Sequence, residues 1–454
     1  MTYDAIIVGA GAAGIAAARR LHDAGRQVLV LEARARLGGR AWTMAAGGFP
    51  LDLGCGWLHS ADRNPWSEIA REVGVRIDKT PPPWTRPSSP VGFAIEDQRA
   101  FRLALDAFYD RVEEVAQTGV DVAASECLPP DGRWNALIGT VATFIAGAEW
   151  DKVSAIDLHR YADTGVNWRA VEGYGHLIAQ YAEGLDIVLD CPVRRIDHSG
   201  RDLRVETARG TMTASAVIVT IPTALIAQET IVFAPSLPEK IYAAAQLPLG
   251  HDDKLFVSLA SADEFEPDSR LFGRIDRTGT GAYHMRPFGR PLIECYFGGS
   301  LAEALERSGP HAFFDFAKGE LVNLLGNDFA ERIAPVAEHS WGADPFARGA
   351  YSYATPGHAD CRAILAAPVD GRLFYAGEAC STEDFSTAHG AYLTGLAAAE
   401  ALLGGRAGGR RCRGRGWRSG PVGGGVGRRG AAASPGEPWG GSVEGRKGPA
   451  ARTS

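Results

Sequence analysis

The first 40 residues contain a glycine fingerprint that limits the chain to a small number of folds. An apolar stretch over residues 4–8 leads into Gly9, Gly11 and Gly14, and an alanine-rich helix is expected over residues 15–21. In this pattern the glycines allow a tight turn, close approach of the backbone to a pyrophosphate, and close packing of the helix on the strand. The helix N-terminus then faces the phosphates. The sequence therefore predicts a Rossmann-like dinucleotide-binding unit.

A second strand and an acidic residue follow at the spacing of such a unit. Residues 27–31 are apolar and lead to Glu32, whose carboxylate can accept hydrogen bonds from a ribose diol and would repel a 2′-phosphate. The next glycine pair, Gly38 and Gly39, is followed by Arg40 and offers a second approach to phosphate, which an NAD enzyme does not need. We therefore expect FAD, and no metal. The cofactor positions predicted in this half are Gly9, Gly11, Ala13, Gly14, Glu32, Arg34, Gly38, Gly39 and Arg40.

Length and composition predict a large globular protein. The 454 residues, 45% of them hydrophobic, can bury a sizeable core and suggest two or three domains. The seven cysteines are scattered without a CxxC pair, which argues against a disulfide framework or a zinc site. The apolar residues 5–18 follow no basic segment, and no other run approaches a membrane span. We expect a soluble, cytoplasmic protein.

Residues 405–454 form a tail of a different composition. It is rich in glycine, arginine and proline and contains eleven basic residues against two acidic ones. Such a composition predicts disorder. A basic arm for nucleic acid is one interpretation; a solvated tail or an out-of-frame translation of GC-rich DNA is favoured over it, so no nucleic-acid partner is expected.

Apolar strands and helical patterns divide the rest of the chain into two kinds of segment. We predict an α/β protein with a discontinuous Rossmann-like FAD-binding domain and an inserted α+β substrate-binding domain. The first would consist of residues 1–80, 185–235 and 365–404, and the second of residues 81–184 and 236–364. Further strands are expected over 187–189, 203–207, 216–220 and 373–376, and over 254–259 and 291–297 in the second domain. Its helices are expected over 101–115, 134–148 and 311–325.

Ordered motifs recur along the chain at residues 32–40, 54–59 with 64–65, 249–254, 341–353, 375–378 and 387–392. Together they resemble the flavin-containing amine oxidase family, which includes polyamine oxidases, monoamine oxidases and lysine-specific histone demethylases. The resemblance implies that Gly377 lets backbone approach the flavin and that Glu378 accepts a hydrogen bond from its ribityl chain or from water. A helix starting near Thr387 would aim its positive end at the isoalloxazine. Further implied cofactor positions are Trp57, Val193, whose backbone would hold adenine, and Ala388.

The resemblance also implies a substrate side of the flavin. Tyr351 corresponds to one wall of an aromatic slot that orients a substrate nitrogen, and Trp341 is the other large aromatic residue of that segment. The opposite wall, a tyrosine in monoamine oxidases, falls on Ala391, so we expect a wider slot. Lys254 corresponds to the family's flavin-facing lysine; in a buried strand its ammonium needs a polar partner or a lowered pKa. His59 is expected to contact the substrate amine. The alternatives are a surface lysine and a histidine without a role.

These features predict an FAD-dependent amine oxidase. The amine, with a free pKa of about 10.4, must be presented neutral, and it is oxidised to an imine and then an aldehyde while oxygen becomes hydrogen peroxide. A polyamine, or another secondary or primary amine, is the expected substrate, and the acidic chain outside the tail would attract it. The alternatives are a flavin desaturase or porphyrinogen oxidase, an amino-acid oxidase, and a chromatin or scaffold protein.

The expected partners are the small-molecule amine and oxygen, with no membrane. A homodimer is left open by the sequence. Monoamine oxidases hold FAD through a cysteine where this chain has Ala350, so noncovalent FAD is predicted.

Overall fold

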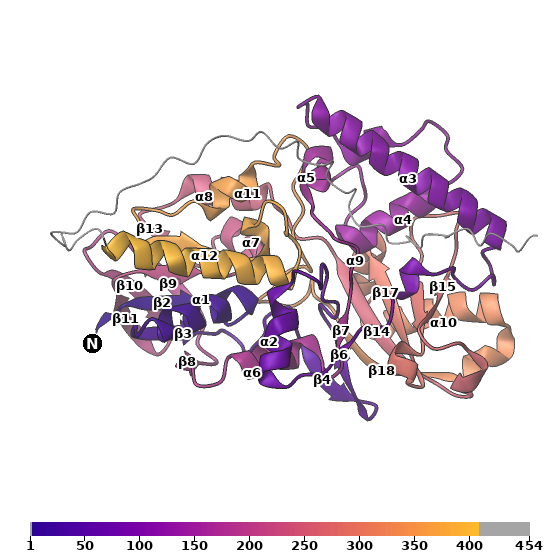
Figure 1. Ribbon diagram of the computed structural model, residues 1–454, viewed down its shortest axis with the longest axis horizontal. Coiled ribbons are helices and arrows are strands. Elements are labelled where there is room, and N and C mark those ends of the chain that lie inside the picture. The colour runs from indigo at the N-terminus through magenta and orange to yellow at the C-terminus, as the bar shows by residue number, and fades with distance from the viewer. Residues whose placement is uncertain (1, 408–454) are drawn as a thin grey trace, which may run out of the picture.

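The computed structural model describes residues 2–407, which form two lobes (Figure 1). The first lobe contains the N-terminus, two stacked sheets and the long C-terminal helix; the second contains an antiparallel sheet with helices around it. The chain passes between the lobes several times, so residues far apart in sequence meet at their junction.

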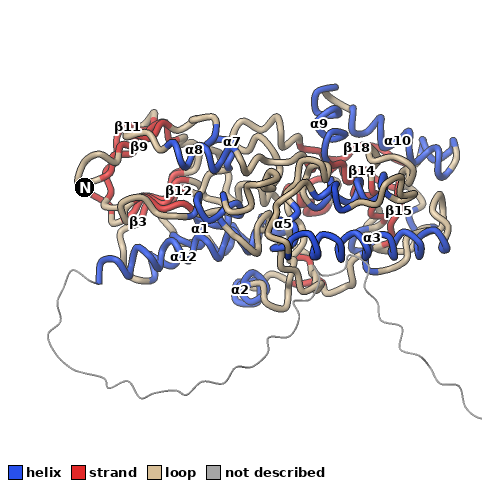
Figure 2. Tube along the Cα trace, turned by 90° about the horizontal axis from the view of Figure 1, so that it is seen from above, coloured by secondary structure: helices blue, strands red, loops and turns tan. Residues whose placement is uncertain are grey.

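A parallel sheet forms the centre of the first lobe, with strand order β19-β12-β2-β3-β8. Its strands are β2 (Ala5–Val8), β3 (Val28–Leu31), β8 (Ile187–Val188), β12 (Val217–Val219) and β19 (Leu373–Tyr375). Because alternate side chains point to opposite faces, Ile7, Val30 and Ile218 share one hydrophobic core with helices α1 (Ala12–Asp23) and α12 (Ala388–Ala407). Figure 2 shows these helices on the same side of the strands.

The second sheet of this lobe packs against the other face of the parallel sheet. Its order is β1-β11-β10-β9-β13, with β1 (Thr2–Tyr3), β9 (Val193–Asp197), β10 (Leu203–Thr207), β11 (Gly210–Ala214) and β13 (Val232–Ala234). Ile6, Leu29 and Val217 of the parallel sheet share a core with Ile196 and Val205 of this one. Both faces of the parallel strands are therefore buried, which explains their continuous apolar sequences.

The second lobe contains a five-stranded antiparallel sheet of order β15-β16-β17-β14-β18. The strands are β14 (Asp252–Leu259), β15 (Ser269–Phe272), β16 (Ala282–Met285), β17 (Leu292–Gly298) and β18 (Ile333–His339). One face, with Leu255, Tyr283 and Cys295, packs in a core with α9 (Gly299–Ser308) and α10 (Ala312–Leu325). The alternate residues of these strands, which include Phe256, His284 and Glu294, point to the opposite face, toward the first lobe.

The remaining elements surround these sheets. The helices are α2 (Pro65–Val73), α3 (Ile95–Gln117), α4 (Asn135–Ile145), α5 (Ala155–Arg160), α6 (Tyr174–Tyr181), α7 (Thr223–Ala227), α8 (Pro238–Ala245) and α11 (Cys361–Ala366). β4 (Thr43–Ala46) and β5 (Phe49–Asp52) form a small hairpin, and β6 (Ile77–Asp78) pairs with the distant strand β7 (Arg169–Ala170). Short 3₁₀ turns are η1 (Pro83–Thr85), η2 (Ala124–Cys127), η3 (Ala262–Glu264), η4 (Pro287–Gly289), η5 (Asn327–Glu331) and η6 (Glu378–Cys380).

Several element boundaries differ from the sequence expectations. Helix α1 begins at Ala12, directly after the turn, and not at residue 15. Helix α3 starts at Ile95 and not near residue 101, since Glu96 and Asp97 suit a helix N-terminus. Helix α12 continues to Ala407, so it enters the segment predicted as a disordered tail. The rest of that tail lies outside the described residues.

Segments that we assigned to the substrate-binding domain also pack in the first lobe. Helix α6 contributes Tyr174 and Leu177 to the core that contains α1. Helices α8 and α11 contribute Ala243 and Cys361 to the core between the two sheets. Hydrophobic pattern alone could not assign these helices, because an apolar stripe shows that a helix is covered but not by which partner. Within residues 2–407, none of the helices combines the length and the apolar character needed to span a membrane.

Candidate active site

A cavity of about 480 Å³ lies where the two lobes meet. Every site residue predicted from the sequence lines it, with the exception of Gly14. Residues of the dinucleotide turn form one end. The cavity-facing side of the antiparallel sheet forms part of the other.

Gly14 acts beneath the cavity wall, in the packing of α1 on β2. A methyl group added at Gly14 would lie 1.9 Å from the Gly9 carbonyl oxygen, so only glycine allows the helix this close. Gly9 has φ +106°, a backbone conformation that residues with a side chain rarely adopt. The Thr220 hydroxyl donates a hydrogen bond to the Gly9 carbonyl oxygen. No side chain caps the N-terminus of α1, which is anchored at Gly11. The turn therefore presents backbone amides and a positive helix end, as a pyrophosphate requires.

Glu32 is held in a fixed orientation at the end of β3. It is 3% exposed, and its two carboxylate oxygens accept hydrogen bonds from the Ala10 and Arg34 amides at 2.7 and 2.9 Å. Each carboxylate oxygen can accept more than one hydrogen bond. The residue therefore retains the capacity to bind a ribose diol.

The predicted phosphate-side arginines are both paired within the chain. Arg34 donates to Asp344 at 2.6 Å, and Arg40 donates to Glu378 at 2.9 Å and to the Ala350 carbonyl. Burial alone would raise the pKa of Glu378, but Arg40 and Ser352 outweigh it, so its pKa is lowered and the carboxylate stays charged. Glu378 thus has several donors from the chain itself. Its contact with the ribityl chain or with water stays a prediction.

The N-terminus of α12 points into the cavity wall, with Thr387 as its cap. The Thr387 hydroxyl accepts a hydrogen bond from the Gly390 amide and donates to the Asp384 carbonyl. Ala388 and Ala391 from the first turn line the cavity. Val193, the first residue of β9, also lines the cavity.

Lys254 lies on the cavity-facing side of β14 and is 6% exposed. Its ammonium is 3.0 Å from Glu294 Oε1 and donates to the Asp52 carbonyl at 3.3 Å. Burial opposes the charged form, but Glu294 and Asp52 together raise the pKa of Lys254, and the same pairing lowers the pKa of Glu294 far below its ordinary value. Of the two expectations for this lysine, the polar partner is the one found; the residue is not a surface lysine.

A chain of polar contacts between buried titratable side chains continues from Glu294. His284 has Nδ1 3.4 Å from Glu294 and Nε2 2.9 Å from Asp268. Arg169 then links Asp268 at 2.9 Å with Asp78 at 2.6 Å. Despite burial, His284 and Arg169 lower the pKa of Asp268 to about 2. Lys254 is therefore one end of a network that reaches the β6–β7 strand pair.

The two aromatic residues of the predicted slot differ in their surroundings. The Tyr351 hydroxyl donates to the Phe144 carbonyl at 2.7 Å, and burial raises its pKa well above the ordinary value. Trp341 is 2% exposed; its indole donates to the Leu53 carbonyl at 2.9 Å and it packs against Gly54. Tyr351 thus joins α4 to the cavity wall, while Trp341 is mostly a core residue with one edge at the cavity.

His59 and Trp57 lie on the loop that follows β5. His59 Nδ1 is 2.7 Å from the Asn167 side-chain oxygen, and burial lowers the pKa of His59, so a neutral imidazole is favoured. Trp57 packs edge-on against Trp84 and lies under the Arg169 guanidinium. Both residues line the cavity, but substrate contact by His59 stays a prediction.

Several cavity residues were missed by sequence reasoning. Strand alternation places Asp252 beside Lys254 on β14, and the paired strands add His284, Tyr296 and Arg270 on the same face. Asp252 could have been predicted, because residues two positions apart on a strand point to the same face and Lys254 was already expected to face the flavin. The other three could not be found, because their position depends on strand pairing and register that no local motif encodes.

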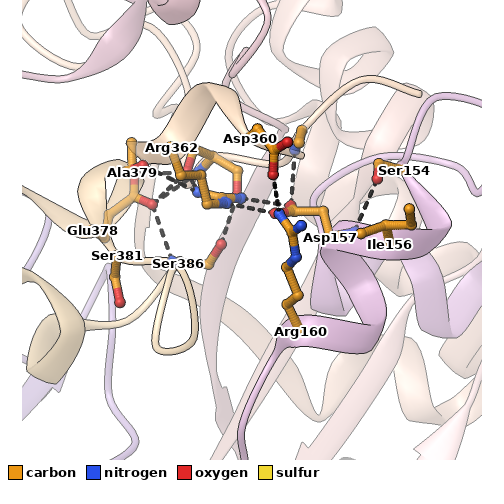
Figure 3. Close-up of polar contacts among 12 residues, drawn as sticks. Ser154, Ile156, Asp157, Arg160, Asp360, Arg362, Glu378, Ala379, Ser381 and Ser386 are labelled. Atoms are coloured by element: carbon orange, nitrogen blue, oxygen red, sulfur yellow. Dashed lines mark hydrogen bonds and ion pairs between the residues drawn. The ribbon is translucent and has the colours of Figure 1, made fainter. Parts of the chain in front are cut away.

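A buried ion pair between α11 and α5 joins the two lobes (Figure 3). Arg362 of α11 makes two hydrogen bonds of 2.7 Å to Asp157 of α5, and its third nitrogen donates to the Ser352 hydroxyl. Ser352 in turn donates to Glu378 at 2.6 Å. Arg362 is fully buried and stacks on Phe385 at 3.8 Å. The position of Glu378 therefore depends on a contact between the two lobes.

Fold and site together define a flavin-dependent oxidoreductase. The chain matches the family described as flavin containing amine oxidoreductase over residues 12–129 and 139–403. It is 30% identical over 438 residues to polyamine oxidase 2 of Arabidopsis thaliana, with 87% of each chain covered. It is 28% identical over 451 residues to lysine-specific histone demethylase 1 homolog 2 of the same plant, covering 88% of this chain and 58% of that one. The chain therefore belongs to the flavin-containing amine oxidoreductase family.

Solved structures agree with this fold. Putrescine oxidase bound to putrescine has a TM-score of 0.71 at 20% identity, over 89% of this chain and 99% of that chain. Cyclohexylamine oxidase from Brevibacterium oxydans IH-35A has a TM-score of 0.72 at 21% identity, over 90% and 100%. The predicted fold class, the family and the FAD cofactor are confirmed, and the protein is an FAD-dependent amine oxidoreductase.

Proposed function

We propose that the protein oxidises a primary or secondary amine, di- and polyamines included, and uses oxygen as the electron acceptor. The observation that carries this proposal is an aromatic-walled cavity continuous with the dinucleotide turn, with the Lys254–Glu294 pair in its wall. The similarity to polyamine oxidases supports the amine class.

The residues present fit FAD, since the glycine turn, Glu32 and the N-terminus of α12 offer sites for pyrophosphate, ribose and an electron-rich ring. The chemistry that bound FAD supplies is a two-electron oxidation: a hydride leaves the carbon next to the substrate nitrogen, the resulting imine reacts with water to give an aldehyde, and the electrons reduce oxygen to hydrogen peroxide.

The chain's own residues would position the amine and manage its protons. Tyr351, fixed by its bond to Phe144, orients the substrate nitrogen, while apolar and aromatic neighbours exclude water. Ala391, with its small side chain, leaves room for a substituted nitrogen. Lys254 holds a proton at its ammonium for use when the flavin is reoxidised.

A screen of amines by two readouts tests this function. Anaerobic mixing should bleach the flavin absorbance with spermidine, with a secondary amine or with a simple primary amine, and peroxide should appear in air at the same rate as aldehyde. A porphyrinogen and a carotenoid are the matched comparison for the desaturase and porphyrinogen-oxidase alternatives. If no amine reduces the flavin while one of these does, the proposed function is wrong.

An α-amino acid is the second candidate substrate, because Arg270 of β15 lines the same cavity. Burial lowers the pKa of Arg270 to about 9, so it stays cationic at neutral pH and could bind a carboxylate. Phenylalanine and 2-phenylethylamine differ only in that carboxylate. We expect faster flavin reduction by the amine; a preference for the amino acid would favour the second candidate.

A further inference from the structure

Asp252 is a half-buried acidic residue in the cavity that the function above does not use. It is the first residue of β14 and, two positions before Lys254, points to the same face of the sheet. Its side chain lines the cavity, and its buried Oδ1 has no hydrogen-bond partner within residues 2–407. A buried, unsatisfied carboxyl oxygen costs free energy, so it needs an explanation.

Its neighbour along the strand provides a contrast. Asp253 points to the opposite face, where its Oδ1 accepts a hydrogen bond of 2.9 Å from the Trp341 amide and its carboxyl group interacts with Glu306. One Asp253 oxygen thus has a backbone donor, its Oδ2 has no hydrogen-bond partner within residues 2–407, and the side chain lies away from the cavity. Asp252, by contrast, faces the place where the substrate is expected.

Among residues 2–407, Lys254 is the one cation that affects the ionisation of Asp252. Lys254 attracts its charged form, Glu294 repels it, and the Tyr351 hydroxyl interacts with it favourably. Tyr296 and Asp253 are also close enough that the charge of Asp252 contributes to raising their pKa values. Lys254 is already paired with Glu294 at 3.0 Å and with the Asp52 carbonyl. A positively charged ligand beside Tyr351 would therefore supply the missing partner.

We propose that Asp252 is a catalytic residue that receives the proton of the bound substrate ammonium and leaves the amine neutral for oxidation. This rests on the proposed function. One N–H bond of R–NH₃⁺ breaks and one O–H bond forms on the carboxylate, which gives R–NH₂ and a carboxylic acid with no change in total charge. The neutral nitrogen then has the lone pair that hydride loss from the neighbouring carbon requires.

The ionisation of Asp252 in the free protein sets the proton count. Burial, with a smaller contribution from Glu294, raises its pKa to about 8, against the effects of Lys254 and Tyr351. Below pH 8 the free carboxyl holds a proton, so binding of an ammonium should release one proton to solvent. Above pH 8 the Asp252 carboxyl group is already deprotonated before the ligand binds, and the number of protons released on binding should approach zero.

Calorimetry of the FAD-loaded enzyme measures this release directly. The probe is 2-phenylpropan-2-amine, which has no hydrogen on the carbon next to nitrogen and cannot be oxidised. Titrations in two buffers of different ionisation enthalpy should give about one proton released at pH 7 and almost none at pH 9. Asp252→Asn should release almost none at either pH and bind at least tenfold more weakly, because the group that accepts the ammonium proton and then hydrogen-bonds the amine is lost. Asp253→Asn is the matched control and should release protons like the wild type.

Reduction kinetics give an independent test with the fastest amine of the screen. In the wild type, the second-order rate constant for anaerobic flavin reduction should rise tenfold per pH unit and level off near pH 8. In Asp252→Asn it should be at least 10²-fold lower at pH 7 and rise without a break toward the pKa of the free amine. Asp253→Asn should keep the break.

The proposed function and the role of Asp252 can be tested separately. If no amine reduces the wild-type flavin, the proposed function is wrong. If amines do reduce it and Asp252→Asn keeps the wild-type proton release and the break near pH 8, the role of Asp252 is overturned while the function stands.

Discussion

Single side chains in this site are defined more by their partners than by their own chemistry. Lys254, Asp252 and Asp253 are consecutive or nearly so, yet one is an ammonium paired with Glu294, one is an acid facing the cavity, and one is an acid facing Glu306. Alternation along β14 separates them. Their different environments allow each to be tested by a substitution that keeps its shape.

Replacing Lys254 with Met should slow reoxidation of the reduced flavin by oxygen about 10²-fold while FAD stays bound, because a positioned acid-base group is lost. Rapid mixing of the reduced enzyme with oxygen measures the step. The variant also leaves Glu294 without its nearest cation, which should cost about 3–5 kcal/mol of stability. The double variant with Glu294→Gln should recover part of that stability but not the rate; unchanged reoxidation in both would remove Lys254 from the reaction.

Replacing Ala391 with Tyr should narrow the cavity at the first turn of α12. Ala391 is 9% exposed, so a tyrosine ring at this position must displace its neighbours or the bound substrate. Such overpacking costs about 1–3 kcal/mol. We expect a greater loss of flavin-reduction rate for branched amines than for slender ones. Equal losses across the amine series would mean that Ala391 does not face the substrate.

Noncovalent FAD is expected, because Ala350 cannot form a thioether and the Cys55 thiol is a poor nucleophile. Cys55 lines the cavity, and burial raises its pKa to about 12, so little thiolate is present at neutral pH. Acid precipitation should therefore leave the yellow colour in the supernatant. Flavin that sediments with the protein would contradict this, and Cys55→Ser would then identify the attachment.

At the scale of elements, the sequence predicted what depends on local pattern. The turn from Gly9 to Gly14, the acid at Glu32 and the strand containing Lys254 could all be identified, because each has its own spacing of residue types. What could not be predicted comes from pairing between distant strands. The position of His284 between Asp268 and Glu294, and the placement of α6 in the first lobe, follow from tertiary contacts.

The turn after β18 provides a pH-dependent contact between elements. Burial disfavours the charged form of Asp344, but His339, Arg34 and the Phe346 amide lower its pKa to about 2. Since this is below the ordinary carboxyl pKa of about 3.9, the stabilisation is complete above about pH 4 and is lost as the pH falls through 2. Asp344→Asn should lower the free energy of unfolding by about 2 kcal/mol at pH 7. The difference from wild type should shrink as the pH falls from 4 to 2; a constant difference would mean that the charge is unimportant.

At the scale of the whole molecule, the cavity lies at a junction that the chain crosses repeatedly. Its walls come from the dinucleotide turn, the antiparallel sheet and the first turn of α12, and the Arg362–Asp157 pair joins the two lobes. A cofactor in this position contacts both lobes, so its binding free energy is shared by their association.

Removing FAD should therefore destabilise the whole protein and not one lobe. A ligand at a hundred times its Kd stabilises the folded state by about 2.7 kcal/mol, so the thermal midpoint should fall when FAD is stripped and recover when it is added back. Gly14→Ala should behave like the stripped protein even with FAD present, because its methyl group would lie 1.9 Å from the Gly9 carbonyl oxygen. Gly319→Ala, whose methyl group meets open space on α10, is the matched control and should respond to FAD as the wild type does. If stripping FAD melted the first lobe alone, with a second transition unchanged in scanning calorimetry, the two lobes would be independent folding units.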